Sequence, residues 1–145
     1  MKSPLVARPL SKVAVEQLAG EFALSDLTLP FWGYRKKMPM HRIVRLEGEG
    51  NYTLFHFADG SQLMVSLTLK KMESRLSSKV FARPHKKNII NLLYLEGIYP
   101  GQQLCAGLVN GDRVEVSRRK ASRFIKQVKG FQQELKTMYT PSLVS

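Results

Sequence analysis

Basic residues cluster where the sequence predicts the start of the last helix. Arg118, Arg119 and Lys120 would occupy its first turn, and Arg123 lies one turn further on. A helix N-terminus carries about half a positive charge, so each cation there costs roughly 0.3–1 kcal/mol. Local conflicts of this kind are expected at functional sites. Arginines beside helix N–H groups suit phosphates or base edges, and a solvated basic face is the alternative.

A second basic segment, Arg83-Pro84-His85-Lys86-Lys87-Asn88, lies between two strand-like stretches. Proline cannot donate a hydrogen bond to a neighbouring strand, which favours a loop or an edge position. The two lysines can neutralise phosphates, and the histidine and asparagine can donate to or accept from base edges. For His85, a structural hydrogen bond that braces the loop is an equally good explanation.

A third segment, Glu47-Gly48-Glu49-Gly50-Asn51-Tyr52, predicts a loop between strands that can approach another molecule closely. It contains neither of the glycine-rich motifs that cradle phosphates. The carboxylates of Glu47 and Glu49 would repel a nucleic-acid backbone. The contacts expected from this loop are therefore Asn51 and Tyr52.

Enzymatic and metal chemistry find little support in the sequence. His41, His56 and His85 do not have the spacing of metal ligands, and there is no nucleophile elbow. The single cysteine, Cys105, lies in an apolar stretch and is expected to be a small core residue. We therefore predict no enzyme, no cofactor and no metal. One cysteine and no signal-peptide-like or membrane-spanning apolar run predict a reduced, cytoplasmic setting.

The positive charge is unevenly distributed along the 145 residues. The net charge is +12, and residues 1–34 contain equal numbers of basic and acidic groups, so the whole excess lies in residues 35–145. A field of this kind attracts polyanions, with nucleic acid the first expectation and an anionic membrane surface the second. The alternative is that the charge only aids solubility.

Composition and periodicity predict three regions. Residues 1–38 form an N-terminal arm that is weakly ordered or binds a partner, with a possible short helix from Val13 to Phe22. Residues 39–130 form the main domain, and residues 131–145 are the end of the last helix and a tail. The aromatic run Phe31-Trp32-Gly33-Tyr34 is expected to cap the core edge or pack against a partner chain, and base stacking is the alternative.

The main domain is expected to be mostly β-structure. Strands are predicted within residues 41–46, 52–57, 62–65, 81–83, 88–91, 94–99, 104–109 and 113–116. Asp59-Gly60 and Asn110-Gly111 predict two-residue turns, the second of type I′, in which both residues have positive φ. A short helix is expected over residues 66–76. Apolar residues spaced three and four apart from Ala121 to Leu135 predict an amphipathic C-terminal helix.

The ordered set of segments resembles the LytTR DNA-binding family of bacterial transcription regulators. The matching pieces are Ile43–Glu47 leading to Gly50-Asn51-Tyr52, Ser66-Leu67 opening a short helix, Phe81–Lys86 running into Ile89-Ile90-Asn91, Ile98, and Val116–Arg119. They extend over about residues 41–128. Pro84 and Lys87 depart from the family pattern, in which an aliphatic residue and a serine are more usual.

The resemblance implies an elongated sandwich of small antiparallel sheets whose loops enter successive major grooves of double-stranded DNA. Base-reading positions would be Asn51, Tyr52, Lys86 and Arg118, and phosphates would be held by neighbours such as Lys87 and Arg119. The family typically binds promoter direct repeats, with a second copy on the same face of the DNA. Many members carry a phospho-receiver domain; the arm here is too short for one, so aspartate phosphorylation is not expected to be the switch.

We therefore predict a sequence-specific double-stranded DNA-binding transcription regulator. The predicted DNA-binding residues are Asn51, Tyr52, Arg83, His85, Lys86, Lys87, Asn88, Arg118 and Arg119. An RNA-binding module is the first alternative, which aromatic residues exposed on a sheet would favour. A protein-docking domain, with the aromatic run and the last helix as its interface, is the second.

Overall fold

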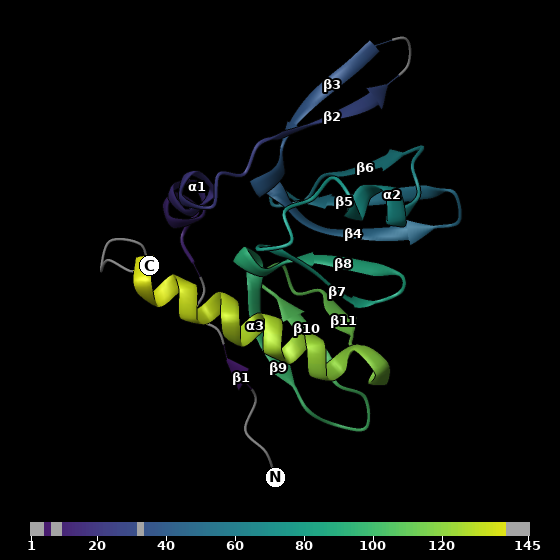
Figure 1. Ribbon diagram of the computed structural model, residues 1–145. Coiled ribbons are helices and arrows are strands. Elements are labelled where there is room, and N and C mark those ends of the chain that lie inside the picture. The colour runs from purple at the N-terminus through teal and green to yellow at the C-terminus, as the bar shows by residue number, and fades with distance from the viewer. Residues whose placement is uncertain (1–4, 7–9, 32–33, 139–145) are drawn as a thin grey trace.

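The computed structural model describes residues 5–6, 10–31 and 34–138 of the chain. Its largest element is an antiparallel five-stranded sheet in the order β6-β5-β4-β8-β7 (Figure 1). The strands are β4 (Ile43–Glu49), β5 (Tyr52–Phe57), β6 (Gln62–Val65), β7 (Phe81–His85) and β8 (Asn88–Asn91). The strand β7, which contains Pro84, lies at the edge of the sheet, as expected for a residue that cannot donate to a neighbouring strand.

A second antiparallel sheet has the order β1-β9-β10-β11. Its strands are β1 (Leu5–Val6), β9 (Leu95–Tyr99), β10 (Cys105–Leu108) and β11 (Arg113–Glu115), and the 3-10 helix η2 (Leu92–Tyr94) leads from β8 into β9. The two-residue strand β1 belongs to the predicted arm and pairs with β9 through Leu5 and Ile98. This sheet therefore joins the beginning of the chain to the main domain.

The third sheet is a hairpin that the sequence did not predict. Its strands are β2 (Asp26–Phe31) and β3 (Tyr34–Pro39), and Figure 1 shows it projecting beyond the five-stranded sheet. Leu27 and Leu29 are buried, with polar or proline positions between and beside them exposed, which is the alternation of a half-buried strand. The predicted boundary between arm and domain, at residue 38, falls inside β3 and stays a prediction. The tip residues Trp32 and Gly33 lie outside the described residues.

Besides η2, the described residues form four helical segments: α1 (Lys12–Glu21), the 3-10 helix η1 (Met40–Arg42), α2 (Leu69–Glu73) and α3 (Arg118–Met138). The helix α3 buries Phe124, Val128 and Phe131, which are three and four residues apart and so share one face. The ring of Phe131 stacks on Phe22, just after α1, with 5.6 Å between ring centroids. The first helix of the arm is thus packed against the last helix of the domain.

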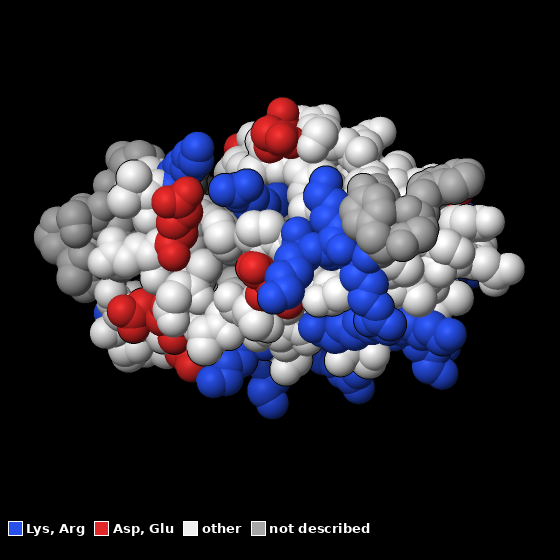
Figure 2. All heavy atoms as spheres, turned by 90° about the horizontal axis from the view of Figure 1, so that it is seen from above, with Lys and Arg blue, Asp and Glu red and all other residues white. Residues whose placement is uncertain are grey.

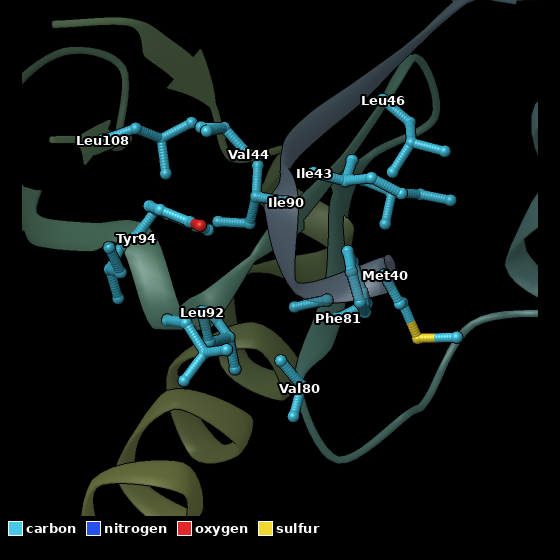
Figure 3. Close-up of a cluster of buried hydrophobic side chains, with 14 of the residues drawn as sticks. Met40, Ile43, Val44, Leu46, Val80, Phe81, Ile90, Leu92, Tyr94 and Leu108 are labelled. Atoms are coloured by element: carbon cyan, nitrogen blue, oxygen red, sulfur yellow. The ribbon is translucent and has the colours of Figure 1, made fainter. Parts of the chain in front are cut away.

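One hydrophobic core joins the two larger sheets. Val44 of β4, Ile90 of β8 and Leu108 of β10 are each at most 1% exposed, and Figure 3 shows their side chains gathered with those of the neighbouring elements. Burying a side chain of this size contributes about 1.5–3 kcal/mol. The predicted fold class is confirmed: a mainly β domain of small antiparallel sheets with a short middle helix and a C-terminal helix.

Two hairpin loops differ from their predicted geometry. In the loop after β10, Leu108 and Asp112 form the closing backbone hydrogen bond, and Gly111 alone has a positive φ, at 93°. The loop after β5 is closed in the same way between Phe57 and Ser61. Both loops therefore contain three residues, and the predicted two-residue turns, including the type I′ turn at Asn110-Gly111, are wrong.

Candidate nucleic-acid interface

The turn between β4 and β5 presents the first predicted contact. Glu49 pairs with Tyr52, so Gly50 and Asn51 form a two-residue turn. Gly50 has a φ of 63° and Asn51 does not have a positive φ, which is the pattern of a type II′ hairpin turn. Asn51 is exposed, and Tyr52 is 50% exposed. Both side chains are available to another molecule.

The turn between β7 and β8 presents the second group of predicted DNA-contacting residues. His85 pairs with Asn88, which leaves Lys86 and Lys87 exposed at the tip. This turn is adjacent to the end of β4, because the Gly48 N–H donates to the Lys87 carbonyl oxygen at 2.8 Å. The first two tips are therefore held side by side by the backbone.

The start of α3 presents the third group of predicted DNA-contacting residues. It follows β11, and the Ser117 N–H donates to the Pro84 carbonyl oxygen at 2.9 Å, just before the β7–β8 turn. Arg118 and Arg119 are both exposed. One backbone hydrogen bond thus links the start of α3 to the β7–β8 hairpin, just as one links the β7–β8 turn to the end of β4.

The three tips share one edge of the molecule. In Figure 1 the β4–β5 turn, the β7–β8 turn and the beginning of α3 all lie at the right-hand side, and backbone hydrogen bonds join each to the next. Because these contacts are between backbone groups, the side chains at the tips remain available. We call this surface the tip edge; it comprises Asn51, Tyr52, Lys86, Lys87, Arg118 and Arg119.

Arg83 lies beneath the tip edge, engaged with other parts of the chain. Its Nη1 donates to the Glu73 carboxylate at 2.8 Å, and its Nη2 donates to the Lys86 carbonyl oxygen at 2.7 Å. Its Nε is buried and has no hydrogen-bond partner among the described residues. The guanidinium therefore ties α2 to the tip of the β7–β8 turn, and contact with DNA stays a prediction for this residue.

His85 and Asn88 also support the turn from within. The Lys87 N–H donates to His85 Nδ1 at 3.1 Å, so the bracing role considered for this histidine is present. Asn88 Oδ1 accepts a hydrogen bond from Arg45 Nη1 at 3.0 Å. Both residues are half-buried, and their predicted DNA contacts remain untested. Of the predicted site residues, these two and Arg83 form the layer below the tips.

Arg45 is a supporting residue that the sequence reasoning missed. Its Nε donates to the Asp112 carboxylate at 2.8 Å, and its Nη1 lies 3.4 Å from Glu47, which in turn contacts His56 Nε2 at 3.1 Å. The signal was present: a charged residue interrupts the apolar run of β4. What the sequence does not contain is the partner, which is 67 residues away.

The electrostatic effect of Arg45 is clearest at Asp112. Burial acts to raise the pKa of this carboxyl group, but the hydrogen bond and positive charge of Arg45, together with a hydrogen bond from Asn110, act against it, and the pKa lies below its usual value. Asp112 is therefore an anion that ties the loop after β10 to the middle of β4.

A small recess of about 240 Å³ lies between the α2–β7 connection and α3. Arg83, Lys120 and Arg123 contribute to its lining, with Glu73 as the acidic group. Burial, followed by the charge of Arg83, lowers the pKa of the Lys120 ammonium group. Positive charge is thus concentrated behind Arg118 as well as at the tips.

Figure 2 shows how charge is distributed on the face seen from above Figure 1. Lys and Arg gather over one half of this face and along its lower margin, while most of the acidic side chains lie in the other half and near the centre. Such separation creates a directional field that attracts a polyanion to one part of the molecule.

Two further expectations concern side chains away from the tip edge. Cys105 is half-buried in β10, with its Sγ 3.5 Å from the Gln103 carbonyl oxygen, so its assignment to the core is wrong. Phe55, Phe57 and Phe81 are at most 8% exposed. These sheet aromatics belong to the core, and they do not form the stacking surface that an RNA-binding module would need.

Within the described residues no set of three or more His, Cys, Asp or Glu side chains is placed to hold a metal ion. Over the same part of the chain, no helix combines the length and the apolar character needed to cross a membrane.

Comparison with known proteins places this chain among DNA-binding domains. The model of the LytTr DNA-binding domain matches residues 35–129, which is most of the chain. The chain therefore belongs to the LytTr DNA-binding domain family, and the resemblance seen in the sequence is confirmed. The family is defined by DNA binding and is not an enzyme family.

A solved structure supports the same assignment. The LytTr DNA-binding domain of a Bacillus cereus protein described as a methyl-accepting/DNA response regulator is similar, with a TM-score of 0.62 and 26% sequence identity. The similarity covers 72% of this chain and 96% of that one. Comparison with curated proteins yields no match.

Proposed function

We propose that this protein is a transcription regulator that binds double-stranded DNA in a sequence-specific manner. One observation carries the proposal: the β4–β5 turn, the β7–β8 turn and the start of α3 are joined along one edge by the Gly48–Lys87 and Ser117–Pro84 hydrogen bonds. A common edge allows all three to meet the same rod-shaped ligand. Membership of a DNA-binding family supports duplex DNA as that ligand.

The tips would divide the work of binding. Asn51, Lys86 and Arg118 carry amide, ammonium and guanidinium groups that can donate to base edges in the major groove. Lys87 and Arg119, one position further along at their tips, would neutralise phosphates and give a salt-dependent affinity. In this arrangement base contacts provide specificity and phosphate contacts provide position.

Arg83, His85 and Asn88 would act mainly by positioning the tips. Each forms a hydrogen bond within the chain that shapes or anchors the β7–β8 turn. Prearranged side chains lose less conformational freedom on binding, which improves affinity without adding contacts. Direct contacts from these residues to DNA would add to this positioning role.

The target would be a promoter element, with direct repeats that allow a second copy to bind the same face of the DNA. Selection of binding sites from random duplexes tests both parts. The expected result is an enriched motif that recurs with a fixed spacing of about one or two helical turns. Enrichment of no motif, with equal retention of all duplexes, would contradict sequence-specific binding.

A further inference from the structure

A cleft lies at the end of the five-stranded sheet that is remote from the tip edge. It has a volume of about 820 Å³ and lies between α1, β3, η1 and the β5–β6 loop. Small-molecule sites commonly measure roughly 300–1,000 Å³. In the β4–β5 pair, Phe57 at the cleft pairs with Ile43, and Tyr52 at the tip edge pairs with Glu49. The length of these strands therefore separates the cleft from the proposed DNA-binding surface.

The cleft has an apolar surface that remains partly open to water. Val15 of α1 and Phe57 of β5 are buried, and Met38 and Leu63 lie half-buried against the hydrophobic core. Val109, at its margin, is 41% exposed. Covering such a surface removes apolar area from water and so favours a ligand with an apolar body.

Cations surround this surface. Lys12, Lys37 and Arg42 line the cleft and are exposed, and within the described part of the chain none of the three forms an ion pair. They come from α1, β3 and η1, so they face the cleft from different elements. Lys36 is a fourth basic residue in the lining.

The acidic groups of the lining are fewer and partly engaged. Glu16 lies one helical turn from Lys12, and the Asp59 carboxylate already accepts hydrogen bonds from the backbone and hydroxyl groups of Ser61, at 2.9 and 2.6 Å. Tyr94 adds no negative charge: burial raises its pKa to about 12, and its hydroxyl donates to the His41 carbonyl oxygen. The cleft therefore keeps an excess of positive charge.

We propose that this cleft binds a small organic anion, with an aromatic or aliphatic body and one carboxylate, sulfonate or phosphate group. The body would lie against Phe57 and Leu63, and the anionic group would pair with Arg42 and Lys37. Charge complementarity and the apolar surface together select this chemistry over a neutral or a purely ionic ligand. Leu10, Lys12, Val15 and Glu16 precede the family match at residues 35–129, so this wall of the cleft lies outside the matched segment.

The test uses two dyes of similar shape and different charge. The anionic probe is 8-anilinonaphthalene-1-sulfonate, and the neutral one is N-phenyl-1-naphthylamine; both fluoresce more strongly in apolar sites. The full chain is expected to bind the anionic dye saturably, with one molecule per chain. The double variant Lys37→Glu/Arg42→Glu should weaken the anionic dye about tenfold or more and the neutral dye less than about twofold, because only the anion pairs with these cations.

Matched variants separate the site from general charge effects. Lys70→Glu/Lys79→Glu makes the same change of net charge at exposed residues outside the cleft, and should leave the affinity for both dyes unchanged. Ala58→Trp places an indole at an exposed position of the lining and should exclude both dyes without changing the melting temperature.

Three results would overturn the proposal: no saturable binding of the anionic dye, equal binding by the chain and all of its variants, or displacement of the dye by a short duplex in direct competition. The last result would identify the cleft as part of a DNA-binding surface. None of them would decide whether the tip edge reads DNA, which is tested separately.

Discussion

Replacement of Arg118 by alanine should separate specificity from general affinity. The side chain is exposed, and among the described residues it makes no hydrogen bond or ion pair. Its removal leaves no internal group without a partner, and it takes a cation away from the N-terminus of α3. We therefore expect the free energy of unfolding to rise by roughly 0.3–1 kcal/mol, the cost of a cation at this end of a helix.

The effect on DNA should be much larger. A good contact between arginine and a base edge contributes about 1–3 kcal/mol of discrimination, which corresponds to a loss of roughly 5- to 150-fold on the selected site. On a scrambled duplex the affinity should fall only by the contribution of one positive charge that salt partly screens. Preference at one base pair of the site should relax, because Arg118 is the residue assigned to read it.

Arg119→Ala is the matched control, since it removes the same group from the next, equally exposed position. It should weaken selected and scrambled duplexes about equally and reduce the slope of log affinity against log salt by about 1. Fluorescence anisotropy at salt concentrations from about 50 to 200 mM measures both variants. An equal loss on both duplexes for Arg118→Ala, or a specific loss for Arg119→Ala, would refute the division of roles.

Three further predictions concern the scaffold. Asn91→Ala should lower the free energy of unfolding by about 2–3 kcal/mol in chemical denaturation. This fully buried amide donates to a carbonyl of β4 at 2.9 Å and accepts from the backbone of η2. A loss below about 0.5 kcal/mol would contradict the prediction. Gly107→Ala should lower the melting temperature, since an added Cβ would lie 2.8 Å from the Tyr99 ring, and an unchanged value would show that the ring moves freely. The Asp112 pKa is depressed in the folded chain, so its contribution to stability is present above the unfolded pKa of about 4 and is lost as the pH falls below it. Asp112→Asn should therefore flatten the loss of stability between about pH 5 and 3, and an unchanged pH profile would show that the carboxylate contributes nothing.

The elements that were predicted well are those in which the sequence pattern and the tertiary structure agree. The last helix has apolar residues at helical spacing, and it forms from Arg118 to Met138. The middle helix was predicted over residues 66–76 and is shorter, from Leu69 to Glu73. Thr68 defines its start, because its side chain accepts a hydrogen bond from the Lys71 N–H. Capping of this kind fixes a boundary that hydrophobic periodicity leaves open.

The turns and the arm were harder to predict for identifiable reasons. Asn110-Gly111 correctly indicated a hairpin, but the pair alone does not show how many residues the loop contains. The hairpin β2–β3 was missed because its residues were assigned to a weakly ordered arm that Pro30 interrupts. Pro30 pairs with Arg35 in a two-stranded sheet. Both strands of such a sheet are edge strands, and an edge strand can accommodate proline.

The candidate site was predictable at its tips and not in its supports. Asn51, Lys86 and Arg118 stand out as exposed polar residues near turns or a helix start. The roles of Arg83 and Asn88 depend on partners in other elements: Arg83 on Glu73, and Asn88 on Arg45, 43 residues away in the chain. Pairings at such separations follow from strand order, which a single sequence does not provide.

Mapping the three tips on one duplex tests the central claim most directly. In a Cys105→Ser background, single cysteines replacing Asn51, Lys86 or Arg118 would each carry an iron chelate that cleaves DNA nearby. We expect three cleavage positions in the order 51, 86, 118 along one face of the duplex, because the β7–β8 turn lies between the other two tips. Cleavage on opposite faces of the duplex, or by fewer than all three chelates while binding is retained, would contradict the account.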